Sequence, residues 1–456
     1  MHPILLLLPL ALAAADAAPI TLDEALAAAA RSNVDLRIAG TDRSLVGVEE
    51  YASWAGVLPR LDLAANFGNQ YTAPSTQNIT RGYLIPPQPP STLPTLGYEL
   101  SLESIPANDV EQYSLGLTLS IPIFDGMRNW ATIARAKALL RAADKTYDEA
   151  SLNVAFEVTR RFYEVVRAER SLKVLQEAVR RSEELVRRTD ELYQAGRAPR
   201  SETWAARVTL GNDRISVEQQ LARVSDARVA LSTALGRDAD PELRVVPPVN
   251  LDRVAFQEPP GQTALVDLAR RKRPLLNADE QRVQAAAEEI RSAQAGYYPS
   301  VSAQASYNRQ GPYIAGQQGV YGDPTGQYVA TFGVVVNWNL FEGRTTSANV
   351  QRANLNEQRT RLVSEQNLLT VTSEIARSRV GYLTLSASAA LAEENLGSAK
   401  ESLQLAVRRY DAGAGTQVEV RDALLNLTRA ELVLLQARID AIIARADLNR
   451  AVGGAL

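Results

Sequence analysis

Four segments of this chain alternate apolar residues with small or polar ones, the period-two pattern of a β-strand that has one apolar face. The clearest segment runs from Tyr113 to Ile123, where every second residue is aromatic or aliphatic. Similar apolar rows follow 61–71, 301–307 and 328–340. The four segments predict two β-hairpins, at about 58–124 and about 299–341.

Each strand taken alone fits an ordinary half-buried strand, but the chain offers no second sheet to cover four apolar faces. The rest of the sequence is rich in Ala, Arg and Glu and predicts helices, so lipid is the remaining surface for these strands. Strands in hydrocarbon must close into a barrel because no open edge is tolerated there, and the smallest natural barrels have about eight strands. A chain with four strands is therefore expected to be an oligomer.

Between the strands the sequence predicts very long helices. Residues 128–194 contain neither Pro nor Gly, and about 67 residues at 1.5 Å each would span about 100 Å. A counterpart is expected at 344–411, where Gly381 and Gly397 interrupt the run. Shorter helices are expected at 34–56, 201–235, 279–295 and 416–452.

The first long helix carries two apolar stripes, each with steps of three and four residues. One stripe includes Phe162 and Leu172, and the other includes Tyr163 and Leu192. A buried core helix or an ordinary coiled coil also fits such stripes. A tubular wall, in which each helix touches a neighbour on both flanks and meets water on its other two faces, accounts for both stripes.

The two halves of the chain share residues at an offset of about 217 positions, as a duplicated unit would. Phe124 matches Phe341, and Gly196 matches Gly413. The offset is larger at the start of each hairpin, so the first hairpin carries an insertion of about 23 residues. We interpret its Pro-rich stretch at 72–110 as an exposed loop. The expected organisation is a first repeat at 18–236, a Pro-rich linker at 237–262 and a second repeat at 263–456.

Residues 1–17 are interpreted as a secretory signal peptide. The apolar run Ile4–Ala15 is too short to span a membrane as a helix, and cleavage is expected after Ala17.

Composition excludes several kinds of chemistry. The chain has no Cys and a single histidine, His2, so Cys/His metal sites, cysteine nucleophiles and histidine-based triads are not expected. The formal charge is −3, with 49 basic and 52 acidic residues dispersed along the chain, and no basic patch indicates nucleic acid binding. We predict no catalytic residue, no metal and no cofactor.

Several short motifs accompany these patterns: TLDEAL at 21–26, NVDL at 33–36, AGVLP at 55–59, IPIFDG at 121–126 and YDAG at 410–413. In their combination the chain resembles the outer membrane efflux, or TolC-type, proteins of Gram-negative bacteria. The resemblance covers essentially the whole mature chain. It implies a mainly α-helical homotrimer, in which a transmembrane β-barrel of twelve strands sits in outer membrane lipid and is continued by a long periplasmic α-helical barrel.

The resemblance also implies a function. Such a channel-tunnel is the passive exit duct of a tripartite efflux pump or a type I secretion system, gated at its periplasmic tip, with a periplasmic adaptor protein and an inner-membrane transporter as partners. The alternative is a self-contained porin or a structural envelope protein. A diffusion porin has no use for a helical tunnel of about 100 Å, which disfavours that alternative. An enzyme is a more distant third.

Gate residues are implied by the same resemblance. Glu419 and Asp422 stand where the family has two rings of pore-facing acids, and Tyr410 aligns with a tyrosine that helps to hold the closed state. In the first repeat, Glu202 follows Gly196 at the same distance at which Glu419 follows Gly413. Acids in the first turns of a helix are also favoured by the helix dipole alone, so this alternative stays open.

The turns before these acids are expected at Gly196 and Gly413, as left-handed helix C-caps. The resemblance places both turns at the periplasmic tip, where adaptors make contact. The chain departs from the family at Gly415, where a tunnel-closing arginine is expected, and Arg421 or Arg200 would have to replace it.

Large aromatic residues near the helix-proximal strand ends predict an interfacial belt, with general packing aromatics as the alternative. The belt residues are Trp54, Trp130, Trp338, Phe124 and Phe341.

Overall fold

The computed structural model describes residues 19–87, 89, 93–248, 256–311, 313–315, 319–321 and 328–455. The expected signal peptide and residues 249–255 of the expected linker lie outside this part of the chain. The chain divides into two compact units. The first comprises the described residues of 1–50, 135–287 and 355–456, and the second those of 51–134 and 288–354. The long helices α3 and α7 contribute residues to both.

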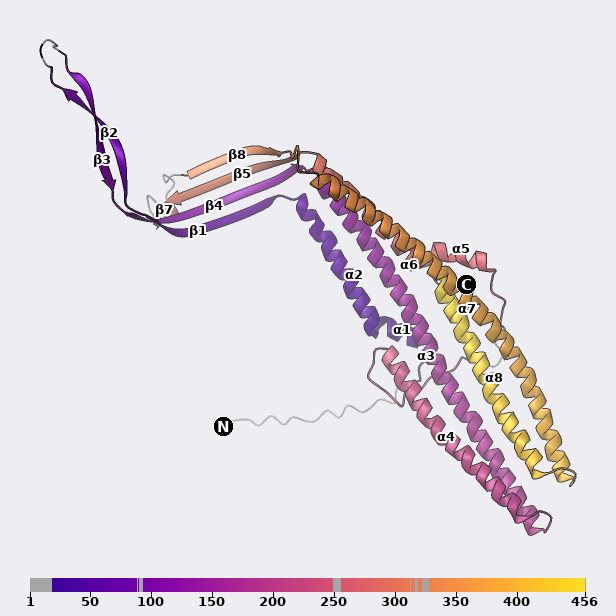
Figure 1. Cartoon of the computed structure of the whole chain (residues 1–456). Coiled ribbons are helices and arrows are strands. Elements are labelled where there is room, and N and C mark those ends of the chain that lie inside the picture. Colours follow the sequence, from indigo (N-terminus) through magenta and orange to yellow (C-terminus); the bar gives the residue numbers. More distant parts are fainter. Residues whose placement is uncertain are drawn as a thin grey trace, which may run out of the picture. The chain divides into compact units, whose positions relative to one another are not determined.

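Helices build the first unit (Figure 1). Their bounds are α1 Leu22–Ser32, α2 Val34–Ser53, α3 Arg128–Gln194, α4 Arg200–Ala234, α5 Gln262–Lys272, α6 Pro274–Gln294, α7 Thr345–Asp411 and α8 Gln417–Val452. The predicted long helix at 128–194 is confirmed as α3, with 67 residues, and α7 has the same length.

The predicted counterpart at 344–411 is confirmed as α7, but Gly381 and Gly397 do not interrupt it, because α7 runs through both as one helix. A glycine keeps its backbone N–H, unlike a proline, so the hydrogen-bond ladder continues through it. The cost of each glycine is about 1 kcal/mol of helix propensity relative to alanine, which a helix of this length tolerates.

Helix α1 begins with a capping box. The Thr21 side chain accepts a hydrogen bond from the backbone N–H of Glu24 (3.3 Å), and the Glu24 carboxylate accepts one from the backbone N–H of Thr21 (2.9 Å). The bond from the Thr21 backbone lowers the pKa of the Glu24 carboxyl. The helix start is therefore fixed by its own sequence.

Two apolar cores hold the helical unit together. In the first, α3 packs against α1, α4 and α8, and members of both predicted stripes of α3, such as Phe162 and Tyr163, are buried there. In the second, Leu265 of α5 and Leu276 of α6 pack with Ile375 of α7 and with the end of α8. Helix α3 is thus apolar on more than one flank because it has neighbours on more than one flank.

Ion pairs between helices define a row in the order α4, α3, α8, α7. Arg228 of α4 contacts Glu169 of α3 at 2.8 Å. Arg167 of α3 contacts Asp440 of α8 at 3.0 Å. Arg438 of α8 contacts Glu393 of α7 at 3.0 Å. Figure 1 shows the same neighbours side by side.

The second unit contains a four-stranded antiparallel sheet in the order β1-β4-β5-β8. Its strands are β1 Arg60–Thr72, β4 Asn108–Phe124, β5 Ser300–Gly311 and β8 Tyr328–Asn337. The two predicted hairpin pairings are present, and β4 with β5 joins them. The fourth strand ends at Asn337, earlier than the predicted 340.

The register of this sheet brings the predicted apolar rows together. Leu63 faces Leu117, Leu117 faces Tyr307, and Tyr307 faces Ala330. Directly paired residues share a face of a sheet, so all four rows lie on one face. That face is open in the single chain, where Phe332 is 80% exposed.

The loop predicted at 72–110 is wrong, because β2 (Ser75–Ile85) and β3 (Thr95–Ile105) form a second antiparallel pair there. Every second residue from Leu96 to Leu102 is apolar, which suits a strand. The prolines Pro86, Pro87, Pro89 and Pro94 lie between the two strands, and Pro90 lies outside the described residues. A short parallel pair, β6 (Tyr313–Ala315) with β7 (Gly319–Tyr321), completes the strands of the described part.

Candidate functional site

The two tip turns follow the ends of α3 and α7. Gly196 and Gly413 have φ angles of +70° and +72°, the left-handed conformation that glycine adopts without strain. The N–H of Gly413 donates to the carbonyl of Tyr410 (3.0 Å) and the next N–H donates to the carbonyl of Arg409 (2.9 Å), with equivalent bonds after Gly196. The predicted helix C-caps are therefore confirmed.

Two of the four predicted gate residues meet at this end of the helical unit. The Tyr410 hydroxyl donates a hydrogen bond to Oε2 of Glu202 (3.2 Å), and the Gln417 side chain donates to the Glu202 carbonyl (3.4 Å). The two contacts join the start of α4 to the end of α7 and to the start of α8. Burial, together with the negative charge of Glu202, raises the pKa of Tyr410 to about 12, so the phenol keeps its proton at neutral pH.

A small apolar cluster lies beside this contact. Leu185 of α3, Ala206 of α4 and Val420 of α8 are buried in it, and the Tyr410 ring packs against them. The cluster positions the phenol for its hydrogen bond, because the ring is held by packing on more than one helix.

The other two predicted gate residues lie in the first turns of α8. Thr416 caps this helix by accepting a hydrogen bond from the backbone N–H of Glu419 (3.3 Å). The Glu419 carboxylate lies 3.5 Å from Arg409, and the Asp422 carboxylate lies 3.1 Å from Arg421. Each acid thus has a cation of its own chain beside it, which reduces the negative field that it projects into solvent.

Neither suggested substitute for the missing arginine bridges the tip helices in this chain. Arg421 contacts Asp422 on its own helix, and the Arg200 guanidinium lies over the Trp204 ring, 5.8 Å from its centroid. Sequence reasoning missed a different ion pair, in which Arg188 of α3 lies 2.7 Å from Asp411 at the end of α7. No sequence periodicity relates residues so far apart along the chain, although Asp411 lies within the YDAG motif.

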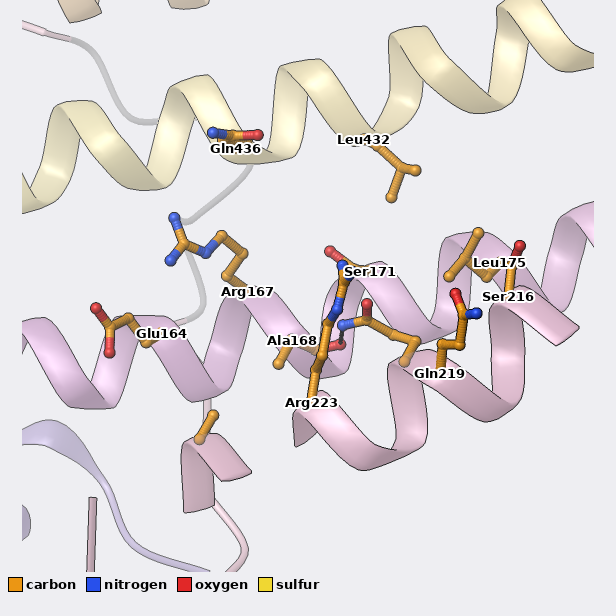
Figure 2. A pocket seen from close by; sticks show the side chains of 12 residues that line it. Glu164, Arg167, Ala168, Ser171, Leu175, Ser216, Gln219, Arg223, Leu432 and Gln436 are labelled. Carbon is orange, nitrogen blue, oxygen red and sulfur yellow. Dashed lines mark hydrogen bonds between the residues drawn. The ribbon is translucent and has the colours of Figure 1, made fainter. Parts of the chain in front are cut away.

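A cavity of about 640 Å³ lies between α3, α4 and α8, away from the turns at Gly196 and Gly413 (Figure 2). Its lining is mostly polar, and Arg167 points from α3 toward α8 (Figure 2). The Gln220 side chain donates a hydrogen bond to the Ala168 carbonyl (3.0 Å) at its wall. Among the described residues no group of three or more His, Cys, Asp or Glu side chains could hold a metal ion.

The predicted belt aromatics lie in the second unit, where strands meet helices. The rings of Trp54 and Trp130 meet edge to face at 6.3 Å, and the Trp338 indole donates to the Tyr297 carbonyl (3.2 Å). Phe341 is 86% exposed. Phe124 ends β4. The placement of these rings in an interfacial belt stays a prediction. Within the described ranges, no helix has the length and apolar character needed to span a bilayer.

Comparisons with known proteins agree on one family. The model of the family "Outer membrane efflux protein" matches residues 25–237 and 265–454. The outer membrane protein TolC of Vibrio cholerae is 21% identical over 365 residues, covering 79% of this chain and 81% of TolC. The toluene efflux pump outer membrane protein TtgC of Pseudomonas putida is 21% identical over 439 residues, covering 93% of this chain and 81% of TtgC.

Solved structures agree on the fold. The Campylobacter jejuni CmeC outer membrane channel matches with a TM-score of 0.76 and 19% identity, over 95% of this chain and 85% of CmeC. The open state of the Neisseria gonorrhoeae MtrE outer membrane channel matches with a TM-score of 0.73 and 21% identity, over 95% of this chain and 89% of MtrE.

Proposed function

Because this chain belongs to the outer membrane efflux protein family of Gram-negative bacteria, we propose that it is the passive outer-membrane exit duct of a tripartite efflux pump or a type I secretion system. The observation that carries the proposal is the sheet register, which gathers four apolar rows on one face. Such a face suits lipid, and the polar rows on the other face suit a water-filled lumen.

The sheet of one chain also supports assembly with further copies. Strands β1 and β8 are its two edges, and an edge in hydrocarbon must be paired. Pairing β8 of one copy with β1 of the next closes a barrel without changing the pairs inside each chain. Closure permits eight, twelve or sixteen strands, and the family resemblance selects twelve, in a homotrimer.

The row of helices supports a tunnel wall. Helices α3 and α8 each contact a neighbour on both flanks, which a curved wall requires of every member. We propose that α4 and α7, the two ends of the row, meet the equivalent helices of neighbouring copies. The same series of helix, helix, strands, long helix and returning helix occupies each half, which supports two repeats at 18–236 and 263–456 joined by the linker at 237–262.

The tip contacts support a gate at the periplasmic end. Tyr410 with Glu202 and Arg188 with Asp411 tie α7 to the α3–α4 hairpin, so they would have to separate for the helices to move apart. We assign the turns at Gly196 and Gly413 to adaptor contact. An inner-membrane transporter would supply the energy, since the duct itself needs no reaction.

Two measurements test this proposal. Native mass measurement in detergent should find trimers, and deletion of the gene should raise the accumulation of an exported dye, which the intact gene reverses. A stable detergent-solubilised monomer would refute the barrel. If the deletion instead slows entry of the dye, the protein is a porin.

A further inference from the structure

The helices of the two halves correspond position by position. Helix α3 spans Arg128–Gln194 and α7 spans Thr345–Asp411, an offset of 217 positions at both ends. Helices α4 and α8 begin at Arg200 and Gln417, with the same offset. A contact between α3 and α8 therefore has an equivalent between α7 and α4, in which each residue is replaced by its counterpart in the other half.

The equivalent contact belongs between copies of the chain. Helices α4 and α7 are the two ends of the row α4, α3, α8, α7, so in a closed ring their outer faces meet neighbouring copies (Figure 1). The tip contact does not cover the outer face of α4, which is centred on Gly211. Glu202, which makes that contact, lies on the opposite side of the helix.

Two arginines of α3 define its contact with α8. Arg181 donates a hydrogen bond to the Thr428 hydroxyl (3.1 Å) and lies 2.9 Å from the Glu431 carboxylate. Arg167 lies 3.0 Å from the Asp440 carboxylate. The two arginines are separated by two heptads, so they mark one stripe of α3 that faces α8.

The counterpart of this stripe on α7 is bare in the single chain. At heptad intervals it consists of Thr384, Leu391, Ser398 and Leu405. Leu391 is 62% exposed and Leu405 is 60% exposed, although both are apolar. An apolar stripe at the spacing of a helix seam indicates a helix as its partner.

The counterpart face of α4 is bare as well. Thr428 corresponds to Gly211, where an added Cβ would have no atom within 4 Å. Trp204 and Ile215 lie on the same face and are exposed. Arg214 contacts Glu183 of α3 at 2.8 Å, yet its side chain remains mostly exposed. The face thus offers apolar surface beside positive charge.

Charges differ between the two contacts in a regular way. Each acid of α8 becomes an arginine of α4, and each arginine of α3 becomes an uncharged hydroxyl side chain of α7. The replacements are Glu431 by Arg214, Asp440 by Arg223, Arg181 by Ser398 and Arg167 by Thr384. Arginines on both sides of a contact would repel each other, so α7 suits the arginines of α4 and α3 does not.

We propose that α7 of one copy packs against α4 of the next in the register in which α3 packs against α8, with Ser398 opposite Gly211, and that the uncharged Ser398 makes this pairing specific. Because the two helices run antiparallel, the same register places Leu405 level with Trp204 of the neighbouring copy. The exposed leucines of α7 are then covered. The inference rests on the proposed trimeric duct and specifies the contact between its copies.

Paired cysteines test the register, because the chain has no cysteine of its own. In Gly211→Cys with Ser398→Cys, a short bismaleimide should link copies into dimers and trimers on denaturing gels. Either single variant should give no link, since a head-to-tail contact does not bring identical positions together. Gly211→Cys with Thr384→Cys is the matched control, because its second thiol is about 21 Å along the same stripe.

Native mass of the wild-type chain is measured first, so that failure of the duct is recognised separately. If the wild-type chain is trimeric and the pair with Ser398→Cys gives no link, the register is wrong. Links from the pair with Thr384→Cys alone would also overturn it. A wild-type chain without trimers would refute the duct itself.

Charge at position 398 gives an independent test. Subunit dissociation is compared in detergent with enough urea to dissociate half of the wild-type trimer. Ser398→Arg should raise the ratio of monomer to trimer roughly tenfold, and Ser398→Glu should lower it, because the new side chain faces Arg214. Gln404→Arg adds the same charge about 120° around α7 and should change the ratio little. A rise in both Ser398 variants, or no difference from Gln404→Arg, would overturn the role of Ser398.

Discussion

Replacing Arg273 by methionine should destabilise the helical unit more than any exposed charge change. The Arg273 side chain is only 4% exposed, and its guanidinium lies 2.7 Å from the carboxylate of Glu149 on α3. It also lies 3.4 Å from Glu374 of α7 and donates to the carbonyls of Arg450 (3.0 Å) and Ala451 (2.8 Å) near the end of α8. One side chain thus joins three helices to the start of α6.

The expected cost follows from what the substitution leaves behind. Methionine fills a similar volume but donates no hydrogen bond, so Glu149, whose side chain is 12% exposed, keeps only the N–H of Leu275 as a donor among these contacts. Breaking one partner of a buried pair costs about 3–5 kcal/mol, because the remaining charge is uncompensated. We expect Arg273→Met to lower the free energy of unfolding by about that amount.

Urea unfolding of the detergent-solubilised protein, followed by far-UV circular dichroism, measures the effect. Glu149→Gln in the same chain should restore part of the loss, since it removes the orphaned charge. The matched control is Arg187→Met, which breaks an exposed pair with Glu184 on α3 and should change stability by less than about 1 kcal/mol. If Arg273→Met costs no more than this control, the buried pair does not hold the helices together.

Three further predictions concern the barrel and the tip. Leu117→Arg should cost roughly 2–4 kcal/mol near the bilayer midplane and Thr118→Arg less, because only Leu117 lies on the face that we assign to lipid; the fraction of heat-resistant trimer on gels compares them. Tyr410→Phe should raise single-channel conductance in planar bilayers, since it removes a hydrogen bond at the tip. The contribution of this phenol is present below its unfolded pKa of about 10 and is lost as the pH rises through about 12, so the wild-type conductance should stay constant across the neutral range. Glu419→Gln together with Asp422→Asn should reduce cation selectivity in the same bilayers, because acids act strongly on a passing ion only within a Debye length of about 8 Å.

Each of these has its own control or refutation. Equal loss of trimer at positions 117 and 118 would show that the face assignment is wrong. A Tyr410→Phe channel that conducts like the parent would remove the phenol from the gate. Glu183→Gln, which changes an acid on α3 that is paired with Arg214, should leave selectivity unchanged. If the double variant at the tip behaves like this control, the two acids serve only as favourable helix-terminal charges.

Local periodicity predicted much of the fold. The alternation from Tyr113 to Ile123 and the stretch without Pro or Gly at 128–194 each correspond to an observed element, because strand and helix periods are written in neighbouring residues. The many prolines at 72–110 led to the wrong prediction of a loop, although β2 and β3 form an antiparallel pair there. At Gly381 the weak propensity of one residue did not interrupt a helix of 67.

The candidate site was predictable only in part. The glycine caps at Gly196 and Gly413 follow from local chemistry. The family resemblance singled out Tyr410 and Glu202 separately, whereas their hydrogen bond to each other was not predicted. The pairing of Arg188 with Asp411 did not emerge, since it depends on which helices lie side by side, and no local pattern carries that information.

The two tip contacts have a consequence for cooperativity. Tyr410 with Glu202 and Arg188 with Asp411 each join residues of one chain, so releasing them in one protomer does not break the same bonds in another. In a trimer, latches confined to single protomers permit three independent opening steps, whereas bonds across protomers would couple them into one transition. We therefore expect single-channel recordings of such a pore to show discrete sublevels instead of a single jump between closed and open.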